Sequence, residues 1–302
     1  MTQIDKPAAD TMKKHVFFIG PKKTGTSWIN SYLERRDDVV TPHTTKETFF
    51  FDRYFSRGPE WYEAQFRPTA DEGSVFVECA PSYAGAPEAI ARICKTVPNA
   101  TFVITLREPV ARVQSHWKHL IRYGHQGKTP LDAMSPESEL FLDSQYADIL
   151  STAIAHAPPG QVFVILYEDL KRDPLAFARS VCHAVGVPEQ APDTEILGRQ
   201  VNGAQKPRNV MISAAAAKGA EVMRNAGLHR VVRIARKSGL RNLLERPYNA
   251  DEARLDTETQ AAIREKLSQQ MLDTAEILRR HPTLAPLGNA DTLAQKISDW
   301  AQ

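Results

Sequence analysis

The sequence predicts a three-layer α/β/α fold of the P-loop type, with a central parallel sheet and a helical C-terminal region. One observation is that short apolar runs of strand-forming residues alternate with helical patterns up to about residue 190. When a parallel sheet is covered on both faces, the sequence of each strand is a nearly continuous apolar run. The other is a glycine-containing turn that joins the first such run to a helix, which is a phosphate-binding arrangement.

The first strand is predicted over residues 15–19 and the first helix over 26–35, with a turn between them that starts at Gly20-Pro21. Trp28 and Tyr32 fall on one stripe of that helix, as expected for a helix covering a sheet. Backbone N–H groups of the turn, the helix dipole and lysine side chains would all favour an anion there. The candidate phosphate-binding residues are Lys22, Lys23, Thr24, Gly25, Thr26 and Ser27.

This turn differs from the loop of nucleotide kinases and ATPases. Gly20 and Gly25 have the expected spacing, but Thr26 stands where the lysine that acts on the β- and γ-phosphates is required. Lys23 instead lies two positions before the second glycine. The sequence therefore disfavours a P-loop nucleotide kinase and retains a site for a 5′-phosphate and a group transferred from it. An ordinary strand–helix turn containing glycine is the alternative.

A second phosphate site is predicted further along the chain. Further strands are predicted over 75–78, 101–106 and 162–166, and helices over 87–95, 110–123, 140–155 and 174–185. Arg107 follows the strand 101–106, at the sheet edge where open α/β folds place ligands, and Ser115 lies about two turns into the next helix. An arginine fork and a hydroxyl can hold a phosphate together. The alternative is a surface pair, Arg107 with Glu108, and a solvated Ser115.

These motifs carry a family resemblance over roughly residues 15 to 190. Residues 21–28, Pro-Lys-Lys-Thr-Gly-Thr-Ser-Trp, resemble the 5′-phosphosulfate loop of sulfotransferases that use 3′-phosphoadenosine 5′-phosphosulfate (PAPS), and residues 106–115 resemble their 3′-phosphate element. Residues 46–53 with 58–62 are similar to the KExHFFD…GxxWY stretch of the heparan-sulfate-modifying branch. Residues 78–83 and 167–170 resemble two further segments of the family, E-K-S/T-P-x-Y and Y-E-D-L.

The resemblance implies a PAPS-dependent sulfotransferase that needs no metal. Lys23 would stabilise charge on the leaving phosphate, and Arg107 with Ser115 would select the 3′-phosphate. Glu47 matches the glutamate that deprotonates the acceptor, whereas His43 would echo the histidine base of the small-molecule branch. We favour Glu47, and Phe49, Phe50 and Phe51 are expected to shield its carboxylate from water and so raise its basicity. A salt bridge with Lys46 is the alternative for Glu47.

Two departures concern the acceptor. Cys79 stands where the polysaccharide-modifying branch usually has lysine, and Thr48-Phe49 replaces the residue pair that includes its histidine. These changes put a heparan-like acceptor in question and leave the cofactor site intact. The acceptor is a small molecule or glycan whose hydroxyl or amine is sulfated, and a sugar, a lipid, a polyketide and a phenol all stay open. A non-catalytic binder of 3′-phosphoadenosine nucleotides would keep Lys23, Arg107 and Ser115 without needing Glu47.

Composition limits the partners and the compartment. The 302 residues carry a formal net charge of +2, so no overall field favours nucleic acid or an anionic membrane. Three widely spaced cysteines fit a reducing compartment rather than a disulfide framework, and neither a signal peptide nor a membrane span is visible. A cytoplasmic protein is expected. His116 and His119 lack a suitably placed carboxylate for a metal site and are expected on the helix surface or in the acceptor cleft.

The last third is expected to close the site. The predicted single domain spans 1–302, with an α/β core over 15–200 that holds the PAPS site and a closing loop with a helical lid or acceptor region over 201–302. Residues 202–208 resemble the cofactor-closing loop of bacterial members, which implies that Lys206 or Arg208 touches a cofactor phosphate. Ten Lys and Arg against two Glu make 206–246 basic. Helices are predicted over 212–224, 229–236 and 257–280, as a lid or acceptor wall.

Overall fold

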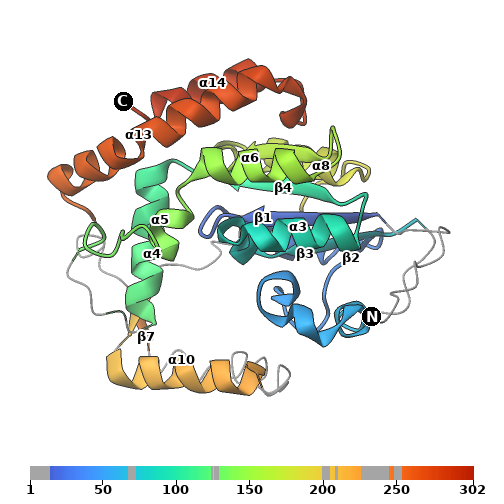
Figure 1. Ribbon diagram of the computed structural model, residues 1–302, viewed down its shortest axis with the longest axis horizontal. Helices are drawn as coiled ribbons and strands as arrows, with labels where there is room; N and C mark the ends of the chain where they lie inside the picture. The colour runs from blue at the N-terminus through green and yellow to red at the C-terminus, as the bar shows by residue number, and fades with distance from the viewer. Residues whose placement is uncertain are drawn as a thin grey trace, which may run out of the picture.

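A five-stranded parallel sheet forms the centre of the molecule, in the order β2-β3-β1-β4-β5 (Figure 1). The computed structural model describes residues 14–66, 73–123, 125, 129–198, 205–207, 210–225, 245–247 and 254–302. The strands of the sheet are β1 (His15–Gly20), β2 (Val39–Val40), β3 (Val75–Cys79), β4 (Thr101–Leu106) and β5 (Val162–Leu166). A separate antiparallel pair consists of β6 (Gln205–Pro207) and β7 (Glu245–Pro247).

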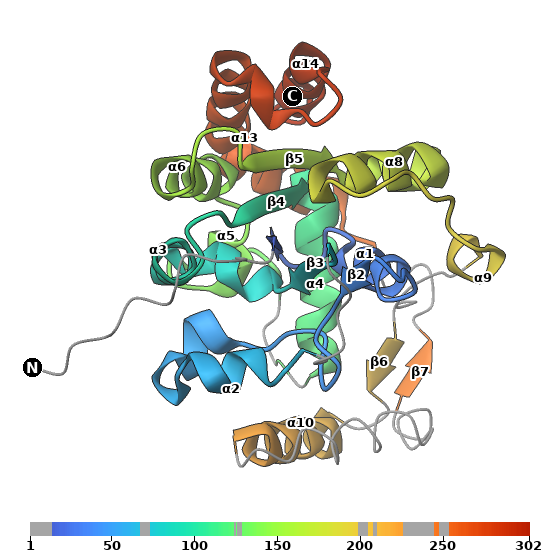
Figure 2. The same cartoon turned by 90° about the vertical axis from the view of Figure 1, so that its right-hand side faces the viewer.

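Helices cover both faces of the sheet, as the alternating order of strands and helices predicts (Figure 2). Their bounds are α1 (Thr26–Leu33), α2 (Pro59–Glu63), α3 (Pro87–Thr96), α4 (Pro109–Arg122), α5 (Glu139–Leu142), α6 (Tyr146–His156), α7 (Tyr167–Arg172), α8 (Pro174–Val185), α9 (Thr194–Leu197), α10 (Val210–Asn225), α13 (Thr257–Arg280) and α14 (Ala290–Asp299). Shorter turns are a π-helix at Phe50–Tyr54 and 3₁₀ turns at Phe55–Arg57, Pro81–Gly85 and Pro282–Leu284. No helix within the described ranges is both long and apolar enough to cross a membrane.

Side chains of β1 alternate between two cores. Phe17 and Ile19 belong to the cluster built with α3, α6, α13 and α14, whereas Val16 and Phe18 belong to the cluster with α1 and α8. All four are at most 1% exposed, since β1 is the middle strand and both of its faces are covered. Because these strands are parallel, the carboxyl ends of β1, β3 and β4 meet at one edge of the sheet, where the loop predicted to bind phosphate (hereafter the phosphate loop) begins.

Two expectations about helices are corrected. The predicted helix 140–155 is two helices, α5 and α6, because the Leu140 carbonyl accepts from the Arg112 guanidinium and the Ser144 hydroxyl instead of continuing the helix. The residues of helix 257–280, expected in a lid or acceptor wall, lie in α13, which packs against α14 and α6 (Figure 1). Its apolar stripe, from Ile263 through Met271 to Leu278, is fully buried. The predicted helix 229–236 lies outside the described residues.

Candidate active site

The phosphate loop connects β1 to α1 through two residues with left-handed backbone. Lys23 has φ +73° and Gly25 has φ +94°, and the Thr24 hydroxyl donates to the Pro21 carbonyl at 2.7 Å. A Cβ atom on Gly25 would lie 2.8 Å from a ring carbon of Tyr167, so this position requires glycine for both its conformation and its space. No side chain caps the N-terminus of α1, so the N–H groups of its first turn point at the loop without a side-chain acceptor.

Cations surround this loop. Burial lowers the pKa of the Lys23 ammonium to about 8, and the charges of Arg107, Arg122 and Lys46 add to the effect. Burial also lowers the pKa of Lys118, again with help from Arg107. Five positive side chains from three separate segments thus interact around a half-buried loop. Such crowding is unfavourable without a counter-charge, and it favours a ligand carrying several negative charges.

Arg107 connects the end of β4 to the loop. Its Nη1 donates to the Lys23 carbonyl at 2.9 Å, and its guanidinium lies 4.5 Å from the centre of the Tyr167 ring. The buried Nε has no hydrogen-bond partner among the described residues. A buried guanidinium N–H without an acceptor is costly, so it indicates a ligand oxygen at this position.

Ser115 lies on α4, half-buried, on the helix face that it shares with Lys118 and Arg122 at i+3 and i+7. Since Lys118 interacts with Arg107 and Arg122 with Lys23, that face is the one turned toward the loop. The strand β6, which contains Lys206, contacts α4. Arg208 and residues 202–204 of the predicted closing loop lie outside the described residues.

Lys46 brings Glu47 to the loop. The Lys46 ammonium donates to the Thr26 hydroxyl at 3.0 Å and pairs with the Glu47 carboxylate at 3.4 Å. The salt bridge considered as an alternative for Glu47 is therefore present, and one nitrogen joins this carboxylate to the first residue of α1. His43 is half-buried, and its backbone N–H donates to the Gln65 carbonyl. Lys46 belongs to the site although sequence analysis did not select it.

Two of the three phenylalanines expected to shield Glu47, Phe50 and Phe51, pack into the core instead. Phe50 stacks on Tyr62 and Phe51 meets Tyr83 edge-on, and both tyrosine hydroxyls donate to the buried carboxylate of Glu78. The Glu47 side chain stays 22% exposed. The expectation was wrong because the π-helical turn directs Phe50 and Phe51 toward the sheet.

Sequence analysis did not identify Glu78, whose buried carboxylate supports the segment that carries Glu47. The Thr48 backbone N–H and hydroxyl donate to its Oε1 at 2.8 and 2.7 Å, so Glu78 fixes the residue that follows Glu47. Burial raises the pKa of Glu78 to about 7, and the hydrogen bonds from Thr48 and the tyrosines oppose that rise. The alternation along β3, which places Glu78 on the same face as Phe76, is the signal that could have revealed it.

The buried Glu78 should make stability depend on pH. Because its folded-state pKa is raised, the folded protein binds this proton more tightly than the unfolded chain, and stability should fall as pH rises from about 4.5 to 7. The contribution is about 3 kcal/mol at most. Chemical denaturation across this pH range should show that decline in the wild type and a flatter curve in Glu78→Gln. Parallel curves would show that Glu78 does not titrate here.

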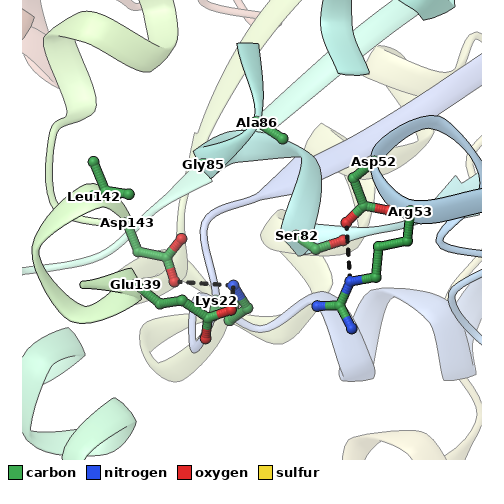
Figure 3. Close-up of a pocket in the computed structure, with 9 residues that line it drawn as sticks. All are labelled: Lys22, Asp52, Arg53, Ser82, Gly85, Ala86, Glu139, Leu142 and Asp143. Carbon is green, nitrogen blue, oxygen red and sulfur yellow. Dashed lines mark ion pairs between the residues drawn. The ribbon is translucent and has the colours of Figure 1, made fainter. Parts of the chain in front are cut away.

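Lys22 points away from the cations of the loop. Its ammonium lies 3.4 Å from the Glu139 carboxylate and 3.7 Å from Asp143, and it lines a cavity of about 240 Å³ (Figure 3). Arg112 and His116 lie behind Asp143 and are fully buried. Of the two locations expected for His116, the helix surface is wrong, because its side chain is buried against this carboxylate.

The cysteine that departs from the family pattern is an inert core residue. Cys79 is 1% exposed and packs with Val77 in the cluster under α1 and α8. Burial raises the pKa of its thiol to about 12, so it carries no charge at neutral pH. It adds no cation where the polysaccharide-modifying branch usually has one.

Comparisons with known proteins agree with the geometry. The sequence model described as "Sulfotransferase family" matches residues 59–192. The chain is 30% identical over 200 residues to mouse heparan sulfate glucosamine 3-O-sulfotransferase 3A1, covering 61% of this chain and 49% of that protein. It is 30% identical over 138 residues to the membrane-associated sulfotransferase kil1 of Dictyostelium discoideum, covering 45% of this chain and 28% of that protein.

A solved structure shows the same fold. The sulfotransferase from Alicyclobacillus acidocaldarius superimposes with a TM-score of 0.54 at 23% identity, covering 73% of this chain and 97% of that one. The chain spans half or less of the length of the two curated relatives. The parallel sheet, the match over residues 59–192 and these relatives agree in one respect: the chain is similar to the sulfotransferase family, near its heparan-sulfate-modifying branch.

Proposed function

We propose that the protein transfers the sulfuryl group of PAPS to a hydroxyl or amine of an acceptor. The observation that carries this proposal is the cation cluster around the loop, with the half-buried Lys23 at its centre and the unpartnered Nε of Arg107 beside it. Lys23, Thr24, Gly25, Thr26 and Ser27 would hold the 5′-phosphosulfate. Arg107 and Ser115 would hold the 3′-phosphate, with Lys206 or Arg208 closing over the cofactor.

Lys22 has a different place in this proposal. Its side chain pairs with Glu139 and Asp143, so only its backbone is left to the phosphosulfate. Three free cysteines suit catalysis in a reducing compartment such as the cytoplasm.

PAPS supplies the sulfuryl group, and the side chains of this chain accept the proton and stabilise the charge. Glu47 takes the proton of the acceptor hydroxyl while the acceptor oxygen forms a bond to sulfur. The bond from sulfur to the bridging oxygen breaks, and 3′-phosphoadenosine 5′-phosphate leaves. Lys23 neutralises the charge that develops on the leaving oxygen, which is stabilisation confined to the transition state.

Two measurements test the proposal. Calorimetry should show tight binding of 3′-phosphoadenosine 5′-phosphate and much weaker binding of ADP, or of ATP with magnesium. A preference for ATP would favour a nucleotide kinase. Incubation with ³⁵S-labelled PAPS and a panel of sugars, lipids and phenols should then label an acceptor, whereas binding without transfer to any of them would favour a sensor.

Replacing Arg107 should show how much its contact with the 3′-phosphate contributes to binding. Arg107→Ala is expected to weaken binding of the bisphosphate roughly 10- to 150-fold, the scale of charged hydrogen bonds. Binding of AMP, which has no 3′-phosphate, should hardly change. Arg172→Ala removes an exposed arginine and serves as the charge-matched control. Equal losses for the bisphosphate and AMP would refute the assignment.

A further inference from the structure

The cavity beside the phosphate loop holds polar groups that no described residue satisfies. Its polar lining comes from Lys22 of the loop, Asp52 and Arg53 of the π-helical turn, Ser82 of the turn after β3, and Glu139 and Asp143 of the α5 region (Figure 3). The π-helical turn starts three residues after Glu47. The cavity therefore lies between the segment that carries the proposed base and the loop that carries the proposed donor.

Asp143 is the central group. Its side chain is 1% exposed, and neither carboxylate oxygen has a hydrogen-bond partner in the part of the chain that the structure describes. Lys22, Arg112 and His116 approach it only to 3.5–4.0 Å. The charges of Lys22 and Arg112 partly offset the carboxylate, but its lone pairs lack donors within hydrogen-bond distance among the described residues.

Two further buried oxygens in the same cavity lack a hydrogen-bond partner among the described residues. Ser82 is 7% exposed and its hydroxyl has no partner among the described residues, and the Oδ1 of Asp52 has none either. Buried acceptors without donors are costly, so a ligand that brings O–H or N–H groups to this cavity would gain hydrogen bonds with Asp143, Ser82 and Asp52.

The charge of the lining limits the ligand further. Three carboxylates, of Asp52, Glu139 and Asp143, face two cations, and Arg53 is already paired with Asp52 at 3.6 Å. Arg112 lies behind Asp143 and does not line the cavity, so among the lining side chains an anionic group would meet more carboxylates than cations, in contrast to the cation cluster around Lys23. About 240 Å³ is also smaller than a pocket for a drug-sized ligand, so one sugar-sized group fits.

We infer that the acceptor presents a non-anionic, hydroxyl-rich group of sugar size to this cavity, and that Asp143 selects it against anionic acceptors. The inference rests on the proposed function, because the cavity is an acceptor site only if the loop holds the sulfuryl donor. It separates this chain from a protein acting on a sulfated polysaccharide. Asp143 is a specificity-determining residue in this arrangement, and Ser82 assists it.

Three probes that share one sugar ring and differ in the substituent on the 2-nitrogen, and hence in charge, test the inference. They are the methyl glycosides of N-acetylglucosamine, glucosamine and N-sulfoglucosamine, which are neutral, cationic and anionic at neutral pH. Each is titrated, by calorimetry or saturation-transfer NMR, into the full-length protein loaded with 3′-phosphoadenosine 5′-phosphate. We expect the neutral and cationic probes to bind and the anionic probe to bind at least about tenfold more weakly.

Variants of the lining residues test which side chain causes the weaker binding of the anionic probe. Asp143→Asn keeps the size of the side chain and removes its charge, so the anionic probe should bind within about threefold of the neutral one. Glu139→Gln removes the same charge from a side chain that is 55% exposed, and solvent screening should leave most of the discrimination in place. Ser82→Ala should weaken binding of the neutral probe and leave the preference for non-anionic probes unchanged.

The outcomes separate the two claims. Failure of the protein to bind the bisphosphate would overturn the proposed function. Normal bisphosphate binding together with equal or tighter binding of the anionic probe, or with binding of none of the three, would overturn only the inference about the acceptor. If Asp143→Asn does not bind the bisphosphate, Ser82→Ala decides whether the cavity holds the probe: unchanged affinity for the neutral glycoside would overturn the inference.

Discussion

Glu47→Gln should lower turnover by about 10²- to 10⁴-fold, the contribution expected of a general base. Glutamine keeps the length of the side chain and can still accept a hydrogen bond from Lys46, which lies 3.4 Å from the carboxylate. It cannot take up the acceptor proton. Steady-state rates with ³⁵S-labelled PAPS should show the loss, and calorimetry should show nearly unchanged affinity for 3′-phosphoadenosine 5′-phosphate.

His43→Ala is the matched control for this prediction. It should cost much less turnover, because we assign the acceptor proton to Glu47, and the backbone N–H of His43, which donates to the Gln65 carbonyl, is kept in the alanine variant. The acid limb of the pH–rate profile should disappear in Glu47→Gln and persist in His43→Ala. An active Glu47→Gln with an inactive His43→Ala would assign the base to the histidine, and normal transfer by both would exclude both.

Lys23→Ala should lower turnover by roughly 10²- to 10³-fold, as is typical when one group that stabilises transition-state charge is removed. The Michaelis constant for PAPS should rise less, because the lysine acts mainly on charge that develops on the leaving oxygen. Initial rates over a range of PAPS concentrations separate the two constants. A rise in the Michaelis constant alone would make Lys23 a binding residue.

The same lysine should couple binding to protons. In the unliganded protein the pKa of Lys23 is about 8, so part of the population is neutral above that pH. A bound bisphosphate favours the charged form, and binding at pH 8.5 should therefore take up protons while affinity falls as pH rises above 8. Calorimetry in buffers of different ionisation enthalpy measures this uptake. Lys23→Ala should abolish it, whereas Lys22→Ala, which alters the neighbouring cavity, should retain it.

The sheet and the donor half of the site were predictable because they depend on local patterns. Apolar runs predicted β1, β3, β4 and β5 to within a residue or two. The loop after β1 and the position of Arg107 at the end of β4 follow from the geometry of parallel strands, which directs their carboxyl ends to one edge. The roles assigned to Lys23, Arg107 and Ser115 stay predictions.

The acceptor half could not be predicted in the same way, because contacts between distant segments build it. Asp143 became a buried carboxylate without a hydrogen-bond partner among the described residues only through the break between α5 and α6, which depends on Arg112 in another helix. Lys22 and Lys23 were both candidate phosphate-binding residues, yet Lys22 pairs with two carboxylates whereas Lys23 lies among cations. Similarly, no local pattern distinguishes a phenylalanine that shields Glu47 from one that packs beside Glu78.

The separation of Lys22 from Lys23 has a consequence for how such proteins diversify. The left-handed backbone at Lys23 places two consecutive lysines in different surroundings, one among cations and the other among carboxylates. Substitutions in the π-helical turn, the turn after β3 or α5 can therefore alter the acceptor cavity while the donor loop keeps its contacts. Acceptor preference can drift, or be redesigned, by exchanging these three short segments on an unchanged cofactor scaffold.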